Sequence, residues 1–489
     1  MSGFQGTNMS AGPLPVKETI YISTAPPPEP AIPPSVNVTV TNNGYWARMN
    51  RQTATSSAVF FFFVYGGMDF AASLGWDPTF SVLMSTEFSY SWFIGVIIGA
   101  LAAMATMTFM PKQVYYVFGG LMQLTGSIIF TAAPDDYSCC LAARYVAGVG
   151  IGFITVPFII HNAEVTGTNQ RGATGGLEQC GLAIGVAAQV VYTTEWLTFL
   201  DGSPNLVHGI LGIVFSLLGL GTCGLAIESP VFFLQRNQEQ KARSCQMQLV
   251  GNNTGVANKY FEEARIYVVE SSSRSLGEEL VASAMPFVKL LLFRCCVAFS
   301  FSLPLTSSII HSSRFVEGMS LTWQLYVWGC LRPIGTLVAL CFLDTIGRKA
   351  VSLVGLLCMA GLMLGMAGLY DDLLSFYTMA QVCNIGMAFQ AFAGLFICSS
   401  SVYLGEAFPL RLKPHLVGLI VIVEQVIHVI VIACIGPGVE VNFFAYFLSV
   451  GIIMLLCVIF FAVSMPETKR MTLREAGHRF QKWYDVTIY

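Results

Sequence analysis

Several ionisable side chains lie inside long apolar stretches, where a charge is costly. They are Asp69, Asp77, Arg144, Glu178, Arg332, Glu424 and His428. A charge at the centre of a lipid bilayer costs about 2.5–3.5 kcal/mol on insertion scales, so such residues usually face a cavity and a partner. Glu424 and His428 are four residues apart and would share one face of a helix. These residues are therefore the first candidates for binding a polar solute or a proton.

A second group of charged residues lies at the ends of the apolar stretches, all on one side of the expected membrane. Its members are Glu164, Arg171, Glu228, Asp344, Arg348, Glu406, Lys413 and Glu467. Acids and bases at helix ends can pair across two helical bundles and separate when the bundles move. An exposed pair contributes only about 0–1 kcal/mol, so a network of weak pairs suits a reversible latch. The alternative is that they are ordinary charges beside a membrane.

The composition identifies the elements that must position these residues. Of the 489 residues, 54% are hydrophobic and 11% are charged, and the mean hydropathy is +0.65. Soluble domains carry about 25% charged residues, so this chain has too few charges to cover a water-soluble surface. The sequence therefore predicts an all-α membrane protein that crosses the lipid bilayer many times.

Several classes of protein are not expected from the sequence. There is no basic block typical of nucleic-acid binding, and no phosphate loop, nucleophile elbow or metal-ligand spacing. The 14 cysteines are scattered, mostly inside apolar stretches, which is typical of small buried hydrophobic residues. We therefore expect no enzyme, no cofactor, no metal site and no nucleic-acid partner.

Twelve apolar stretches are long enough to cross a bilayer as helices, which takes about 20 residues each. They cover residues 55–78, 89–109, 114–133, 139–160, 172–194, 206–227, 287–311, 320–342, 350–370, 374–403, 415–435 and 442–464. A polar stretch separates the first six from the last six, as in transporters built from two bundles. The predicted parts are a Pro-rich, disordered tail (1–54), a first bundle (55–228), a linker with short helices (229–285), a second bundle (286–465) and a C-terminal tail (466–489).

The charges of the connections predict the orientation of the chain. Lys and Arg concentrate in the linker and at every second connection, whereas the alternate connections carry mainly Asp and Glu. Because positive charge marks the cytoplasmic side, we expect both termini and the linker to be cytoplasmic. The protein is expected to be a multi-pass protein of the plasma membrane.

Two motifs that flank this layout carry a resemblance to a known family. Residues 228–234 read Glu-Ser-Pro-Val-Phe-Phe-Leu, and residues 466–473 read Pro-Glu-Thr-Lys-Arg-Met-Thr-Leu. Residues 344–349, Asp-Thr-Ile-Gly-Arg-Lys, and residues 406–409, Glu-Ala-Phe-Pro, add two further matches. Over residues 55–480 the chain resembles the sugar porter family of the major facilitator superfamily, which includes glucose transporters and insect trehalose transporters. The resemblance implies two pseudo-symmetric six-helix bundles, the major facilitator fold.

The resemblance also implies roles for individual residues. Gln179 aligns with a glutamine that contacts sugar, and we take Gln390 and Gln425 as further candidates for the substrate site. Asp77 and Arg144 resemble an aspartate and arginine that work together in proton-coupled members. A carboxylate beside a guanidinium can bind a proton, with a pKa that depends on how close the cation lies. A static pair, or an Asp77 exposed at its helix end, is the alternative.

The chain departs from the family pattern where the substrate is concerned. Residues 299–306 lack the amides of the family's seventh span, and residues 399–401 are serines where the tenth span should present a tryptophan. The turn at residues 108–113 lacks the charged motif that follows the second span in the family. Arg332 and Glu424 introduce charge instead, and we expect them to pair, either around a substrate other than a plain hexose or as a structural ion pair.

Three functions fit these observations. The first is a carrier for a sugar or related small polar solute that works by alternating access, either facilitative or coupled to protons. The second is a carrier for organic ions, which Arg332 and Glu424 favour. The third is a non-transporting, receptor-like protein that senses nutrients through an altered cavity.

Overall fold

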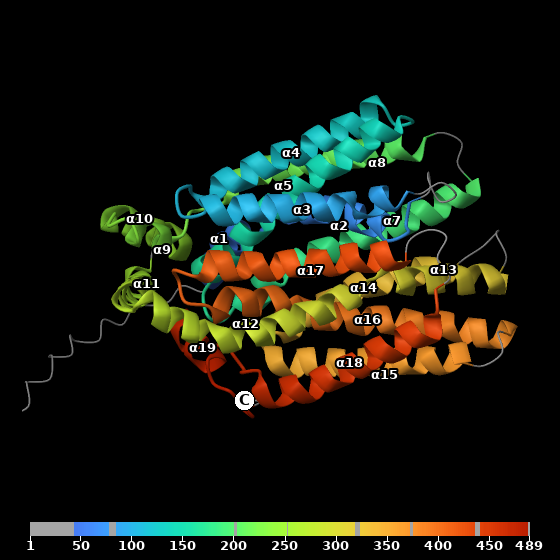
Figure 1. Ribbon diagram of the computed structural model, residues 1–489. Coiled ribbons are helices and arrows are strands. Elements are labelled where there is room, and N and C mark those ends of the chain that lie inside the picture. The colour runs from blue at the N-terminus through green and yellow to red at the C-terminus, as the bar shows by residue number, and fades with distance from the viewer. Residues whose placement is uncertain are drawn as a thin grey trace, which may run out of the picture. The chain divides into compact units, whose positions relative to one another are not determined.

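The computed structural model of the chain describes residues 44–77, 85–199, 203–251, 253–317, 323–371, 375–435 and 441–487. All regular secondary structure in these ranges is helical (Figure 1). Residues 1–43, most of the predicted disordered tail, lie outside the described residues, whereas α1 (Gly44–Ser57) begins inside that predicted tail. The stretch Tyr45–Tyr489 forms one unit, and the arrangement below concerns that unit alone.

The long helices fall into two halves on either side of the linker. The first half holds α2 (Phe60–Ser73), α3 (Thr86–Thr106), α4 (Lys112–Ala132), α5 (Tyr137–Val165), α6 (Arg171–Gly175), α7 (Leu177–Phe199) and α8 (Pro204–Thr222). The linker holds η1 (Cys223–Leu225), α9 (Pro230–Leu234), α10 (Glu239–Val250) and α11 (Thr254–Ser273). The second half holds α12 (Leu276–Phe299), α13 (Leu303–Glu317), α14 (Trp323–Phe342), α15 (Arg348–Asp371), α16 (Phe376–Ala407), α17 (Lys413–Ile435) and α18 (Phe443–Ser464), followed by α19 (Leu473–Phe480).

Eleven helical stretches of the described chain are long and apolar enough to cross a membrane. They match eleven of the twelve predicted spans, and α7 supplies the remaining one. One of them, Leu276–Phe315, is interrupted, because α12 ends at Phe299 and α13 begins at Leu303. Pro304 lies in the first turn of α13, where a proline is tolerated since its missing N–H would lack a helical partner anyway.

The two ends of the long helices differ. Helices α9, α10, α11 and α19 gather at one end, on the left of Figure 1, which we call the linker end. The opposite end, which we call the far end, carries the connections between α2 and α3 and between α4 and α5. At the far end, Ser85 accepts a hydrogen bond from the Phe88 N–H (3.2 Å) and Asp136 accepts one from the Ser138 N–H (2.8 Å). Caps of this kind satisfy free N–H groups of the first helical turn and contribute about 0.5–2 kcal/mol each.

Large apolar side chains cover the outside of both halves. Phe118 on α4, Leu217 on α8 and Leu456 on α18 are 50%, 54% and 60% exposed. In water, so broad an apolar surface would cause the protein to associate, whereas lipid hydrocarbon solvates it. Helices also satisfy their backbone hydrogen bonds internally, as a bilayer requires. The outside of the molecule therefore fits a lipid bilayer.

Glycines set the closest helix contacts within each half. A Cβ atom on Gly185 of α7 would lie 1.9 Å from the carbonyl oxygen of Val64 on α2. The same occurs in the second half, where a Cβ on Gly335 of α14 would lie 2.1 Å from the carbonyl oxygen of Ala391 on α16. Small residues at such crossings let the backbones of membrane helices approach each other. These contacts hold α7 and α14, which both reach the central cavity, against their neighbours.

Gly185→Ala is expected to destabilise the protein by about 1–3 kcal/mol, because α2 and α7 must move apart to admit the methyl group. The melting temperature of the purified protein measures this effect. Gly368→Ala is the matched control, since a Cβ there would meet nothing within 4 Å. An unchanged melting temperature for Gly185→Ala would mean that the two helices are not packed as closely as described.

Candidate functional site

A cavity lies between the two halves at mid-depth of the long helices. Helices α2, α3, α5 and α7 line it from one side, and α12, α14, α16 and α17 line it from the other. The space open to the centres of water-sized probes is about 50 Å³. Its polar lining consists of Thr155, Glu178, Gln179, Arg294, Arg332, Glu424 and Gln425. Four of these residues were predicted to bind substrate, and the structure brings all four to this one cavity.

Arg294 on α12 holds the centre of this cavity. Its Nη1 lies 2.8 Å from Glu424 Oε2 on α17, and its Nη2 lies 3.6 Å from Glu178 Oε1 on α7. All three side chains are buried. Because Arg294 and Glu424 belong to the second half and Glu178 to the first, the pair Arg294–Glu178 joins the two halves. Gln179 donates a hydrogen bond to Glu178 Oε1 (3.1 Å), so its amide is held in the same cluster.

Arg332 has a different role from the one expected. It donates to the Ser300 carbonyl oxygen (3.1 Å), to Ser300 Oγ (2.9 Å) and to Gln390 Oε1 (3.0 Å). Ser300 is the residue after α12, so the guanidinium satisfies a carbonyl at the break between α12 and α13, where the helix dipole favours a cation. The predicted pair of Arg332 with Glu424 was wrong, because Glu424 pairs with Arg294.

Sequence reasoning missed Arg294, although the signal was present. Arg294 stands in a run of leucine, phenylalanine and cysteine residues inside the seventh predicted span. The rule that selected Arg332 and Glu424, a charge inside an apolar stretch, applies to Arg294 equally.

Several polar atoms that face the cavity keep unused hydrogen-bonding capacity. In the described chain, Glu178 Oε2, Gln425 Oε1 and Arg294 Nε have no hydrogen-bond partner. Two of these atoms accept hydrogen bonds and the third donates one. A buried polar atom without a partner is costly, so this set favours a ligand that both donates and accepts.

Contacts between the halves close the cavity toward the far end. The rings of Trp76, after α2, and Trp328 on α14 lie 5.3 Å apart, and both are buried. Phe301 at the helix break packs against Trp328 at 5.4 Å and against Phe70 at 5.4 Å. Helices α3 and α17 lie side by side along the interface (Figure 1), where His428 stacks on Phe93 at 4.7 Å.

A second charged cluster lies inside the first half. Arg144 Nη1 on α5 lies 3.8 Å from Asp69 Oδ1 on α2, and His208 Nε2 on α8 lies 3.1 Å from the same oxygen. Gln189 Oε1 lies 3.2 Å from His208 Nδ1, so the imidazole is held between the amide and the carboxylate. The structure thus pairs Arg144 with Asp69. Asp77 also attracts the Arg144 guanidinium, so the expected relation between Arg144 and Asp77 stays a prediction.

The surroundings of Arg144 fix its orientation. Its Nε donates to the Phe88 carbonyl oxygen (3.2 Å), and its guanidinium lies 4.6 Å from the Phe88 ring centre. It also donates to Ser73 Oγ on α2. Asp77, beyond the C-terminal end of α2, is 6% exposed, and a role for it in proton coupling stays a prediction.

Charged residues at the linker end join the two halves a second time. Arg171 Nη1 lies 3.3 Å from Glu406 Oε1, and Arg348 Nη2 lies 3.5 Å from the same oxygen. Asp344 accepts hydrogen bonds from the N–H groups of Gly172 (3.0 Å) and Ala173 (2.8 Å), in the first turn of α6. Since Arg171 and α6 belong to the first half, both contacts cross the interface. We call this set the linker-end latch.

Burial determines the direction in which the pKa of Asp344 is shifted in the linker-end latch. Burial raises the pKa of the Asp344 carboxyl above its ordinary value, although Arg348 at 3.4 Å and the N–H groups of α6 oppose the shift. The latch is more deeply buried than expected, because the Arg348 and Glu406 side chains have no exposed surface. Each partner therefore depends strongly on the other, since an unpaired buried charge is far more costly than an exposed one.

Other members of the predicted latch make contacts within one half. Lys112 Nζ lies 3.5 Å from Glu164 and 3.4 Å from Glu228, and its N–H donates to Glu228 as well. Burial raises the pKa of Glu228, but Lys112, His161 and backbone N–H groups outweigh burial, and the pKa ends below its ordinary value. Lys112 thus supplies a charge cluster in the first half, where the family motif is absent.

The second half has two comparable contacts. Glu467 accepts hydrogen bonds from the N–H groups of Arg348 (3.2 Å) and Lys349 (2.9 Å) and so caps α15. Lys413 donates to the Gly405 carbonyl oxygen (2.8 Å), and its Nζ lies 5.4 Å from the ring centre of Tyr267 in the linker. These contacts tie the linker and the C-terminal segment to the second half.

The double variant Arg348→Ala with Glu406→Ala is expected to change uptake kinetics while the protein still reaches the membrane. It removes one charge of each sign, whereas Glu406→Ala alone leaves two buried arginines without that carboxylate and should lower the yield further. Uptake rates normalised to surface protein measure the effect. Glu262→Ala with Arg265→Ala, an exposed pair in the linker, is the control. Wild-type kinetics in the double variant would contradict a latch.

Comparison with known proteins places this geometry in a family. The sequence profile of the family described as "Sugar (and other) transporter" matches residues 36–480. "D-xylose-proton symporter-like 1" of Arabidopsis thaliana is 23% identical over 414 residues, which cover 78% of each chain. "Probable polyol transporter 3" of the same plant is 23% identical over 362 residues, 68% of this chain and 70% of that one.

A solved structure shows the same fold. The proton:xylose symporter XylE from E. coli, of the major facilitator superfamily, was determined with bound 6-bromo-6-deoxy-D-glucose. It matches with a TM-score of 0.68 at 17% identity, over 89% of this chain and 99% of that chain. This likeness confirms the expected all-α fold of two six-helix bundles. Because the family profile spans nearly the whole sequence, the chain belongs to the sugar (and other) transporter family.

Proposed function

We propose that the chain carries a neutral polyhydroxylated solute, a monosaccharide or a polyol, across a membrane by alternating access around the central cavity. Membership of a transporter family confirms the expected solute carrier and excludes an enzyme. The relatives named for D-xylose and for polyols support this solute class.

The balance of charge in the cavity is the observation that carries the proposal. Arg294 and Arg332 bring two positive charges, and Glu178 and Glu424 bring two negative charges. An organic ion would add a net charge to this buried set, and a buried charge without a partner costs several kcal/mol. A solute with many hydroxyl groups adds none, and each hydroxyl can donate to Glu178 Oε2 or accept from Arg294 Nε. The observation favours a neutral solute over the organic ion considered from the sequence.

The contacts between the halves support alternating access. The linker-end latch closes one side of the cavity, and Trp76 and Trp328 close the other side. Each closure pairs a residue of the first half with one of the second, so a rocking motion of the halves would break one and keep the other. A fixed pore would not need paired closures.

The cluster around Asp69 supports proton coupling. A buried carboxylate that faces both Arg144 and His208 can exchange a proton when access changes. The proton symporters among the similar proteins support the same view. We infer that Asp69, rather than Asp77, is the proton-binding carboxylate.

The proposed orientation puts the linker end in the cytoplasm. Positively charged residues concentrate there, among them Lys112, Arg348 and Lys469. Both termini then lie in the cytoplasm, and we propose the plasma membrane as the location. Labelling of a cysteine introduced at Arg265 only after permeabilisation of cells would support this orientation, and labelling of intact cells would overturn it.

Uptake by proteoliposomes tests the proposed function. Radiolabelled xylose, glucose and a linear polyol are expected to enter saturably, whereas an organic cation and an organic anion of similar size are not. Protein-free liposomes serve as the control. Saturable uptake of an ion would contradict the neutral-solute proposal. Absence of flux for every solute, with binding retained, would favour a receptor-like protein.

A further inference from the structure

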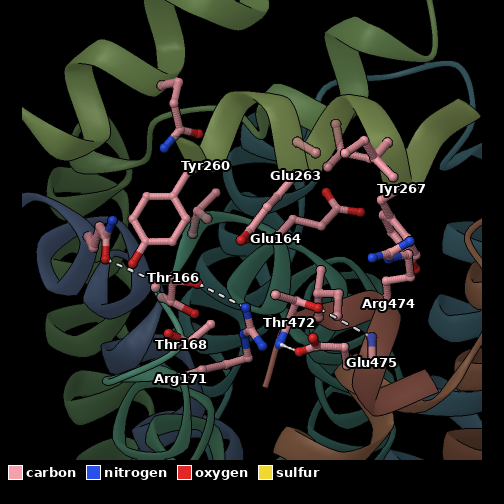
Figure 2. Close-up of a pocket in the computed structure, with 18 residues that line it drawn as sticks. Glu164, Thr166, Thr168, Arg171, Tyr260, Glu263, Tyr267, Thr472, Arg474 and Glu475 are labelled. Carbon is pink, nitrogen blue, oxygen red and sulfur yellow. Dashed lines mark hydrogen bonds between the residues drawn. The ribbon is translucent and has the colours of Figure 1, made fainter. Parts of the chain in front are cut away.

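The segment after the second half is fixed to the linker end of the molecule. Figure 2 shows Thr472 and Glu475, at the start of α19, beside Arg171 of the first half. At the other end of α19, Phe480 has no exposed surface and so anchors the helix in the core. Residues 481–487, which we call the terminal strap, follow directly after this anchor. The terminal strap therefore begins at a fixed point.

Three helices of the second half hold the backbone of the terminal strap. Lys289 Nζ on α12 donates a hydrogen bond to the Lys482 carbonyl oxygen (2.6 Å), and Lys349 Nζ on α15 donates one to the Asp485 carbonyl oxygen. The Asp485 N–H donates to the carbonyl oxygen of Val463 on α18 (2.8 Å). Both lysine side chains are buried, so losing their acceptors would be costly. The strap cannot turn its side chains inward without breaking these hydrogen bonds.

The terminal strap exposes its largest apolar side chains, although its backbone is fixed. Trp483, Tyr484 and Val486 are 75%, 72% and 66% exposed. These three residues line an open recess, in which the space open to the centres of water-sized probes is about 760 Å³. Contact of two aromatic rings and a valine with water is unfavourable, because apolar surface is more stable when it is removed from water. A ligand or a surface that covers these side chains would stabilise the strap.

The strap continues the lipid-facing surface of α18. Ile452, Leu456, Ile459 and Val463 are three or four residues apart and share one helix face, and each is 45–60% exposed. Helix α18 has 22 residues, which corresponds to about 33 Å, compared with about 30 Å for the hydrocarbon core of a bilayer. Val463, the residue before the last of α18, therefore lies where hydrocarbon meets the lipid headgroups. Its carbonyl oxygen is the one that accepts from the strap.

We propose that the terminal strap binds the headgroup region of the phospholipid bilayer at the linker end. Tryptophan and tyrosine concentrate at this level of a bilayer, because their rings are apolar and their N–H and O–H groups stay hydrated. Lys482 is exposed and can extend to a lipid phosphate, whereas Arg479 lies 3.7 Å from Asp485.

The continuity of the surface favours lipid over a protein partner. Lipid covers α18 as far as Val463, so the same leaflet reaches the strap, and a protein would have to displace headgroups to bind there. The proposal rests on the insertion of the chain in a membrane and does not depend on which solute is carried.

Fluorescence quenching in lipid nanodiscs tests where the strap lies. The full-length protein has seven tryptophans, so the signal that is lost in Trp483→Phe isolates the tryptophan of the strap. A lipid that carries a doxyl quencher close to its headgroup is expected to remove most of this signal. Iodide in the water, and a doxyl group at the end of the acyl chain, should each remove little of it. Stronger quenching by iodide or by the deep doxyl group than by the shallow one would overturn the proposal.

Matched variants test whether the aromatic side chains hold the strap to the lipid. In nanodiscs, Trp483→Ser with Tyr484→Ser should let trypsin cut after Lys482 about tenfold faster, equivalent to 1.4 kcal/mol of lost binding. Mass spectrometry of the released residues 483–489 measures the rate. Tyr377→Ser, which removes a tyrosine that is 71% exposed at the start of α16, is the control and should leave the rate unchanged. Equal rates in the wild type and the double variant, or equal acceleration by Tyr377→Ser, would overturn the proposal.

Discussion

Arg294→Met is expected to lower the stability of the protein by about 3–5 kcal/mol and to abolish uptake. The substitution leaves Glu178 and Glu424 buried without the cation that lies 3.6 Å and 2.8 Å from them. Removing one partner of a buried ion pair costs this much because the remaining charge is neither solvated nor compensated. Methionine keeps most of the side-chain length, so the effect reports charge rather than a cavity. Thermal melting of the purified protein and uptake by proteoliposomes measure the two effects.

A triple variant separates the stability effect from the transport effect. Arg294→Met combined with Glu178→Gln and Glu424→Gln removes all three charges, so much of the stability should return while uptake stays low. Arg314→Met, at an exposed arginine near the end of α13, is the control for loss of an arginine. If Arg294→Met melts like the wild-type protein, the charge cluster does not bind the two halves together.

The long helices could be predicted from the sequence because hydropathy alone determines them. A stretch of about 20 apolar residues crosses a bilayer regardless of its neighbours, and the connections follow from where such stretches end. The predicted charged residues at the linker end also lie close together in the structure. Their shared position at one end of the helices was sufficient for that prediction, since helix ends on the same side of a membrane are near one another.

The pairing of charges inside the membrane could not be predicted in the same way. Which carboxylate meets Arg144 depends on the rotation of α2, and Asp69 and Asp77 lie about two helical turns apart along the chain. Arg332 was assigned to Glu424 because both lie in apolar stretches, but the break after α12 draws Arg332 to Ser300. At that break a carbonyl group lacks a helical N–H donor, and only the structure shows which side chain supplies one.

The largest expected effect on coupling comes from Asp69→Asn. If one proton moves with each solute, a gradient of one pH unit supports at most about tenfold accumulation, equivalent to 1.36 kcal/mol. The neutral amide cannot take up a proton, so Asp69→Asn is expected to abolish accumulation while exchange of labelled for unlabelled solute persists. Proteoliposomes with an acidic exterior measure accumulation, and the same vesicles without a gradient measure exchange.

Asp77→Asn is the matched comparison, because both substitutions remove a buried carboxylate. Asp69 lies in the last turns of α2, and Asp77 lies just beyond the C-terminal end of that helix. The ion pair of Asp69 with Arg144 and its contact with His208 predict that only Asp69→Asn uncouples transport. Protonation of Asp69 would weaken its attraction to Arg144 and leave the arginine on its hydrogen bonds to Phe88 of α3 and Ser73 of α2, which links proton binding to the packing of the first half. The opposite result, uncoupling by Asp77→Asn alone, would transfer the proton site to Asp77. Uptake in the wild type that is independent of pH would leave the Asp69 cluster with a structural role, because a static ion pair needs no proton to hold α2 against α5.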